Sequence, residues 1–238
     1  VTIRSGKVGS EDQDFELIGS RFHSWFRDNH KKLFKLKTSD EFYHFCKSNF
    51  PFFVNLYLKI LNGQQVLDVK ISHVYYIKQW GIAESLQNAL LLAPIKLGDD
   101  DGTIQRKLDF VARYIETFTV RRAINSRKFG QTAIKYTMFN IAKLIRDNEI
   151  SILGEHLTQE VGKIAENWER ISDFQLNGMN RKFVKHLLSR ISSYVDNLVG
   201  KGTNYNSYYH PDTGKQFEIE HLWADKFSEH KDEFEQET

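Results

Sequence analysis

The chain has 238 residues, of which 40% are hydrophobic and 27% are charged, and its formal net charge is +2. These fractions are typical of a soluble globular protein, no apolar run approaches the roughly 20 residues that a membrane-spanning helix needs, and the net charge is too small to predict nucleic-acid binding by itself. Cys46 is the single cysteine, which excludes an internal disulfide and fits a reducing compartment. We therefore expect a cytoplasmic protein, and the short apolar runs predict no membrane association.

Helical start signals recur through the first third of the chain. A Ser or Thr followed three residues later by Gln or Glu forms a capping box at 10–13 and again at 38–41. The first predicts a helix with an apolar, largely aromatic stripe. Pro51 fits the first turn of a further helix, and Gly63 is placed to end it. The aromatic neighbours of Cys46 predict that its thiol is buried.

The middle of the chain is predicted to be helical apart from one stretch. Residues 66–80 alternate between apolar and polar types, which favours a short strand or an extended segment. Elsewhere the apolar residues recur at helical spacing, and the most regular pattern is the last one. We expect helices at about 84–92, 103–125, 131–147, 151–168 and 183–198.

The composition changes after the last predicted helix. Residues 203–223 are rich in Tyr, Asn and Thr and contain the turn sequence Pro-Asp-Thr-Gly at 211–214, which predicts a β-hairpin. The sequence therefore indicates a mainly α fold, with a multi-helix body over 1–200 followed by a C-terminal β-hairpin within 201–238. The chain begins without a methionine and stops within an acidic, motif-like stretch, so we interpret it as a segment of a longer protein.

Glu220 and His221 lie in the stretch QFEIEHLWADKF, which covers 216–227. A histidine at the rim of a hairpin suits a general base, because its pKa lies near neutral. The adjacent carboxylate points to the opposite strand face unless a bend re-aims it, and with such a bend both side chains can address one divalent ion and its water. The alternative is an ordinary surface pair, which is what most Glu-His dipeptides are.

Two clusters of basic residues are candidates for contacts with nucleic-acid phosphates. The first surrounds the end of the predicted 103–125 helix, and the second lies opposite the apolar face of the last helix and leads directly to the Glu-His pair. The first cluster comprises Arg121, Arg122, Arg127, Lys128 and Lys135, and the second comprises Arg181, Lys182, Lys185 and Arg190. The alternative for the first cluster is a solvated helix end, where cations favour the helix dipole, and for the second a plain solvent face.

Four stretches of the chain resemble the modification-dependent (type IV) restriction endonucleases of the GmrSD kind. They are DFELIGSRFHSWFRDN at 14–29, LLLAPI at 90–95, LLSRISSYVDNLVG at 187–200 and FEIEHLWADKFSEHKDEFEQE at 217–237. The resemblance covers nearly the whole chain, and the last stretch is the most specific, because Ile-Glu-His begins the HNH-type (ββα-metal) nuclease motif in that family. It implies that 201–238 is the start of an incomplete nuclease module that follows a helical connecting body.

Carried over to this sequence, the resemblance implies that His221 is the general base that activates water for attack on a DNA phosphodiester. Glu220 matches the acidic metal-ligand position, so a divalent ion, Mg²⁺ or Mn²⁺, is implied as the cofactor. Ala224 stands where the broad HNH pattern has proline, which is a departure from that pattern. The family's metal site also needs a later asparagine and a second His or Asn ligand, but no asparagine follows Asn206 and His230 comes too early, so the metal site is incomplete within the chain. The resemblance thus implies a fragment of a phage-defence DNA endonuclease that is inactive, or nearly so, by itself.

A second hypothesis for the chain involves no catalysis. The family's N-terminal, ParB/sulfiredoxin-like NTPase domain carries an Asp-Gly-Gln-Gln-Arg signature, whereas NGQQV at 62–66 lacks the Asp and the Arg and reads as a helix end. In this alternative the helical body is a binding or scaffold module that docks an NTPase domain or a partner protein, and Glu220 and His221 are structural.

Overall fold

The computed structural model describes residues 21–202, 204–210, 217 and 219, and this part of the chain is mainly helical, as predicted. The chain falls into two compact units, Val1–Phe174 and Gln175–Thr238, which we call the first and second unit and describe separately. None of the described helices combines the length and the apolar character that crossing a membrane requires.

The N-terminal part of the first unit begins, within the described residues, at α3. Its elements are α3 (Phe22–Asn29), a π-helical turn (His30–Phe34), α4 (Ser39–His44), a second π-helical turn (Phe45–Asn49) and α5 (Phe50–Gln65). The capping box predicted at 38–41 starts α4: the Thr38 hydroxyl accepts from the Glu41 N–H at 3.3 Å, and the Glu41 carboxylate accepts from the Thr38 N–H at 2.8 Å. Pro51 lies in the first turn of α5, as predicted. The capping box predicted at 10–13 lies outside the described residues.

A small cluster of aromatic rings packs between α3 and the turn after α4. The ring centroids of Phe26 and Phe34 are 5.0 Å apart, and each lies 5.9 Å from that of Phe45. Cys46 is the next residue and is exposed, so the predicted burial of its thiol is wrong. The cluster covers only one side of this helical turn, and none of the residues of the turn is buried.

Gly63 lies inside α5 and does not end it, which corrects the sequence prediction. A Cβ added at Gly63 would lie 2.7 Å from Cδ1 of Ile71, well inside van der Waals contact. The end of the Ile71 side chain would have to shift to admit that Cβ, so glycine at this position allows α5 and the segment that follows it to pack closely.

The strand predicted at 66–80 is wrong, because this segment is helical. A 3-10 turn at Val69–Ile71 leads into α6 (Ser72–Gln79). Residues 74–77, four in succession, are all buried. A helix that is buried on several sides loses the one-sided apolar stripe by which an amphipathic helix is recognised, which is why the local alternation misled the prediction.

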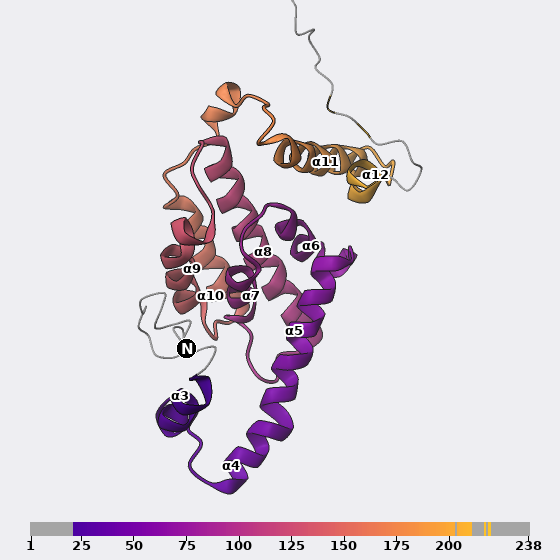
Figure 1. The fold of residues 1–238 in the computed structure, drawn as a ribbon. Coiled ribbons are helices and arrows are strands. Elements are labelled where there is room, and N and C mark those ends of the chain that lie inside the picture. The colour runs from indigo at the N-terminus through magenta and orange to yellow at the C-terminus, as the bar shows by residue number, and fades with distance from the viewer. Residues whose placement is uncertain (1–20, 203, 211–216, 218, 220–238) are drawn as a thin grey trace, which may run out of the picture. The chain divides into compact units, whose positions relative to one another are not determined.

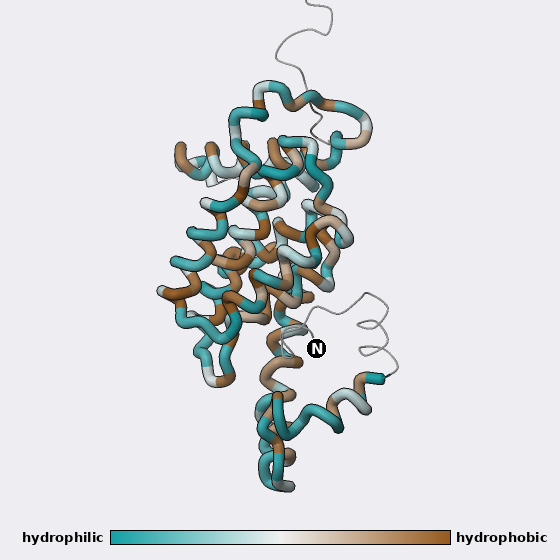
Figure 2. The backbone as a smooth tube through the Cα atoms, turned by 90° about the vertical axis from the view of Figure 1, so that its left-hand side faces the viewer, coloured by the Kyte–Doolittle hydropathy of each residue, from teal (hydrophilic) through white to brown (hydrophobic). Residues whose placement is uncertain are grey.

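The rest of the first unit surrounds one long helix. The elements are α7 (Glu84–Leu92), α8 (Asp101–Ile124), α9 (Gln131–Ile145), α10 (Ile150–Gly162) and a 3-10 turn (Glu169–Asp173). α8 packs against α6, α7 and α10, and α9 packs against α7 and α10 (Figure 1). Leu108, Val111 and Ile115 lie on the core face of α8 and are fully buried. Apolar and polar positions recur at helical intervals along these helices (Figure 2), so the predicted helices are confirmed, although α10 is shorter than expected.

A buried ion pair that the sequence did not predict fixes the loop before α8. Lys107 is fully buried, and its ammonium donates to the Asp99 carboxylate at 2.7 Å and to the Pro94 carbonyl at 2.9 Å. Asp99 also accepts from the Lys96 N–H at 2.9 Å. Taking both charges out of water is costly, and these hydrogen bonds offset that cost. The loop from 94 to 99 is thereby tied to the second turn of α8.

Among its described residues, the second unit has two helices that pack against each other, α11 (Arg181–Leu198) and α12 (Tyr205–Tyr209). α11 was predicted, and Gly200 follows it with a φ of +75°, a left-handed conformation that suits glycine after a helix. The chain then turns back toward α11 through α12.

The sequence predicted a β-hairpin at 203–223. The prediction is wrong for the first strand of that hairpin, because this stretch contains α12. The side chain of Asn204 accepts from the Ser207 N–H at 3.2 Å and so caps a short helix instead of a strand. The predicted turn at 211–214 and most of the second arm lie outside the described residues, which contain no strand.

Candidate nucleic-acid interface

The predicted catalytic pair, Glu220 and His221, lies outside the described residues. The nearest described side chain with a recorded contact is Phe217, whose ring centroid is 5.4 Å from that of Tyr208 on α12. The Tyr208 hydroxyl in turn donates to the Asp196 carboxylate on α11. The chain is therefore held against the α11–α12 pair three residues before the predicted metal ligand, while the roles of Glu220 and His221 stay predictions.

The guanidinium of Arg121, in the first basic cluster, is surrounded by backbone carbonyls. It donates to the carbonyls of Val161 at 3.1 Å and Ile164 at 2.8 Å, and also to that of Glu166. These carbonyls belong to the last turn of α10 and the residues that follow. A cation at this end favours the helix dipole and satisfies acceptors that have no partner within the helix. Arg121 thus fastens the end of α10 to α8.

Arg122 is also engaged inside the first unit. Its Nε and Nη2 donate to the Lys128 carbonyl at 3.0 and 2.7 Å, and its Nη1 donates to the Glu166 carboxylate at 3.1 Å. The guanidinium lies over the ring of Phe118, 5.4 Å from its centroid. The structure therefore gives Arg121 and Arg122 internal partners, and a DNA contact by either residue stays a prediction.

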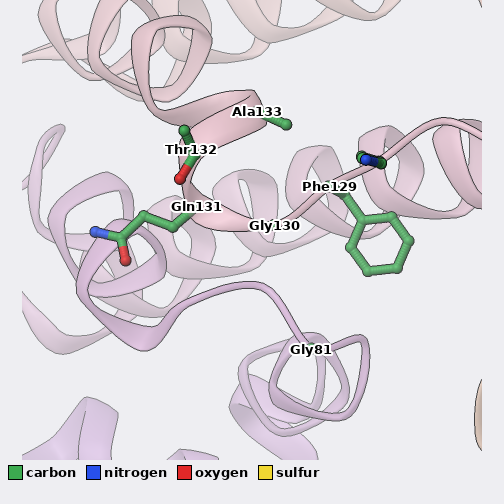
Figure 3. Close-up of a pocket in the computed structure, with 7 residues that line it drawn as sticks. Gly81, Phe129, Gly130, Gln131, Thr132 and Ala133 are labelled. Atoms are coloured by element: carbon green, nitrogen blue, oxygen red, sulfur yellow. The ribbon is translucent and has the colours of Figure 1, made fainter.

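Arg127 and Lys128, two further members of the first cluster, are exposed at the loop between α8 and α9. Lys128 lines an open hollow of 430 Å³ that also borders Gly81 and the N-terminal residues of α9 (Figure 3). Gly130, the N-cap of α9, offers no side chain to the first-turn N–H groups. The positive end of this helix and the lysine both favour an anion such as a phosphate group.

The second basic cluster lies on α11. Arg181 and Lys182 are exposed at the start of the helix, whereas Lys185 and Arg190 are half-buried. The Lys185 ammonium lies 5.9 Å from the ring centroid of Tyr209 on α12, and Arg190 also has a partner within the structure. Arg181 and Lys182 are accordingly the members of this cluster that are most accessible to a phosphate backbone.

The interior of the second unit is polar and aromatic, and sequence reasoning assigned it no role. Nδ1 of His186 lies 2.8 Å from the Tyr205 hydroxyl, and both side chains are fully buried. The rings of Tyr205 and Tyr209 stack with centroids 5.1 Å apart. The signal in the sequence was the spacing of the two tyrosines, four residues apart, which places them on one side of a helix.

A second histidine with acidic partners lies in the first unit. His73 on α6 has its Nδ1 2.8 Å from the Glu116 carboxylate on α8 and its Nε2 3.9 Å from that of Asp109. Sequence reasoning missed this group, because its members are about 40 residues apart in the chain. Within the described residues no set of three or more His, Cys, Asp or Glu side chains is placed to hold a metal ion.

Comparison of the chain with protein families, with curated proteins and with solved structures found no match.

Proposed function

We propose that this chain is part of a divalent-metal-dependent DNA endonuclease of the type IV restriction kind, with His221 as the general base. The observation that carries the proposal is the Ile-Glu-His sequence at 219–221, which lies in the same unit as α11, the helix that exposes the basic side chains of Arg181 and Lys182. Such side chains bind the phosphate backbone without reading sequence, and so position DNA.

In this proposal the residues of the chain act on water and on the phosphate backbone. His221 takes a proton from a water molecule, whose oxygen attacks the phosphorus while the bond to the leaving oxygen breaks. Arg181 and Lys182 hold neighbouring phosphates. A bound Mg²⁺ or Mn²⁺ would stabilise the charge that develops on the phosphate and the leaving oxygen.

Glu220 is the residue proposed to hold the metal ion. A carboxylate is a hard oxygen ligand, which suits Mg²⁺ or Mn²⁺. The family pattern also needs a later asparagine and a second His or Asn ligand, and no asparagine follows Asn206 in this sequence. For this reason we expect the 238-residue chain alone to have little or no nuclease activity.

The test uses the 238-residue chain, supercoiled plasmid DNA and Mn²⁺. We expect binding that weakens as the salt concentration rises, because phosphate contacts release counterions, and at most traces of nicked circles. His221→Ala should abolish any nicking, whereas His210→Ala, which changes an exposed histidine at the end of α12, should not. Arg181→Ala with Lys182→Ala should weaken binding, and Lys163→Ala in the first unit should not. Absence of DNA binding at low salt, or robust cleavage that survives His221→Ala, would contradict the proposal.

A second candidate function is a non-catalytic scaffold that docks an NTPase domain or another protein. It is favoured by the apolar side chains that α5 leaves exposed, among them Phe50, Val54 and Leu58, which recur on one side of the helix. Calorimetry with a purified NTPase domain of the GmrSD kind would test it. Binding should be lost on Phe50→Ser with Leu58→Ser and kept on Tyr136→Ser, a change at an exposed aromatic residue of α9.

A further inference from the structure

α11 turns its polar face toward its neighbour. The side chains of His186, Ser189, Ser193 and Asp196 are buried. They recur at intervals of three and four residues and so lie on one side of the helix. This is the side that contacts α12, through His186 to Tyr205 and through Asp196 to Tyr208.

The opposite side of α11 is apolar and exposed. Leu188 is 42% exposed, Ile191 48%, Val195 48% and Leu198 68%. At 100° per residue these positions lie about half a turn away from the buried polar side. An aligned row of aliphatic side chains is rarely left facing water, and such a row marks a surface that binds another apolar surface. We call these four residues the open face of α11.

A segment of the same chain has the composition to cover the open face. Residues 220–227, with the sequence EHLWADKF, lie outside the described residues and contain the apolar side chains Leu222, Trp223 and Phe227. Phe217 is held against Tyr208, so this segment starts beside the α11–α12 pair. Eight residues can span up to about 26 Å, whereas a helix with its side chains is about 10–12 Å across. The segment can therefore reach the far side of α11.

Charge also favours this segment over a second copy of the chain. Residues 217–238 carry eight acidic side chains and two lysines, a net charge of −6. α11 carries four basic side chains and one acidic one, a net charge of +3. The acidic segment is attracted to the basic helix, whereas two copies of α11 would bring like charges together.

We propose that the open face of α11 is a docking surface for residues 220–227 of the same chain, with Leu222, Trp223 and Phe227 as the apolar contacts. The inference does not depend on the proposed function, because it requires no catalytic role of His221. It assigns a binding role to the apolar side of α11. The sequence had suggested a role only for the basic side of this helix.

The experiment measures how fast a thiol on the open face reacts with a soluble thiol reagent. Cys46 is exposed and would react, so it is first replaced in Cys46→Ser, and Ile191→Cys then provides the single thiol. Adding Leu222→Ala with Trp223→Ala should speed the reaction at least about tenfold, because the covering contacts are removed. Phe234→Ala, an apolar change in the same acidic stretch but outside the docking segment, should leave the rate unchanged. A thiol at the exposed position Lys182→Cys should be insensitive to all of these changes.

Equal rates with and without Leu222 and Trp223 would overturn the proposal. So would a rate that falls as the protein concentration rises, since that result would show that a second copy covers the face. A second variant covers the case in which the double change alters folding. Ile191→Cys with Trp223→Cys, in the Cys46→Ser chain, should form a disulfide within one chain under mild oxidation. Disulfides that form only between chains would contradict docking of the chain on itself.

Discussion

The first unit and the second unit place their apolar side chains in opposite ways. In the first unit, the buried side of α8 is mainly apolar and includes Leu108, Val111 and Ile115, together with the ion-paired Lys107. In the second unit, α11 buries His186 and Asp196 and exposes its aliphatic side. The amphipathic pattern of a helix therefore shows which side needs a partner, but it does not show which neighbour in the chain provides that partner.

The difference follows from the neighbours that each helix has. α8 has helices on several sides, and the hydrophobic effect places its apolar face among them. The described neighbour of α11 is α12, a five-residue helix rich in tyrosine. Buried tyrosine hydroxyl groups need hydrogen-bond partners, which the polar side of α11 supplies.

The largest expected effect tests whether the apolar interior of the first unit depends on a charged residue. Lys107→Ala should lower the free energy of unfolding by about 3–5 kcal/mol, because Asp99 would keep a nearly buried charge without its partner. Urea denaturation followed by circular dichroism measures this. Lys59→Ala is the control: Lys59 pairs with the exposed Asp101, and the loss should be below about 1 kcal/mol. Similar losses for both variants would show that burial does not set the strength of these pairs.

The next effect measures how strongly the first unit relies on its apolar core. Ile115→Ala, at a fully buried position of α8, should cost about 2–5 kcal/mol, because it removes buried methyl groups and leaves a cavity. Ile152→Ala, at an exposed position of α10, removes the same atoms and should cost less than about 1 kcal/mol. Urea denaturation compares the two, and equal costs would contradict the assigned core.

A smaller effect probes the polar interior of the second unit. Tyr205→Phe should destabilise the α11–α12 pair by about 1–3 kcal/mol, because it leaves the buried Nδ1 of His186 without the hydroxyl at 2.8 Å. Amide hydrogen exchange in α11 reports this unit by itself, and exchange should become faster. Tyr194→Phe, at an exposed position of the same helix, should leave exchange unchanged. Unchanged exchange in Tyr205→Phe would show that the polar interior contributes nothing to holding the two helices together.

The smallest effect concerns α4, which belongs neither to the apolar core of the first unit nor to the polar interior of the second unit. The N–H groups of Lys37 and Thr38 donate to Glu41 and hold the pKa of its carboxyl below the usual 4.5. A carboxyl whose pKa folding lowers contributes stability above its unfolded pKa and loses it as the pH falls through the folded value. The protection factors of the α4 amides should therefore fall below about pH 4.5, and Glu41→Gln should reduce that pH dependence. Identical pH profiles for both proteins would contradict this role of Glu41.

The helices of the first unit could be predicted where one side packs and the other faces solvent. The start of α4 was predictable because a capping box is a local signal, confined to Thr38 and Glu41. α6 was not predictable, because it is buried on several sides and lost its stripe. The pair of Lys107 and Asp99 was missed because the contact depends on how the loop before α8 folds back.

The candidate site was predictable to a smaller extent. The sequence indicated basic residues near the end of α8. It did not indicate that Arg121 and Arg122 are engaged with α10 and Glu166, because those contacts join residues 40 or more positions apart. The tyrosine-rich stretch after α11 was interpreted as a strand because Tyr and Asn suit hairpins, whereas Asn204 caps a helix there. Glu220 and His221 stay predictions.

The packing at Gly63 affects the position of the opposite end of α5. The contact between Gly63 and Ile71 lies near the C-terminal end of α5, and about 20 Å of helix separates it from Phe50. A methyl group at Gly63 would meet Cδ1 of Ile71, so the end of the Ile71 side chain would have to shift to admit it. A tilt of α5 by about three degrees at this point would displace the start of the helix by about 1 Å, so the packing of Gly63 against Ile71 affects where α5 presents any surface near Phe50.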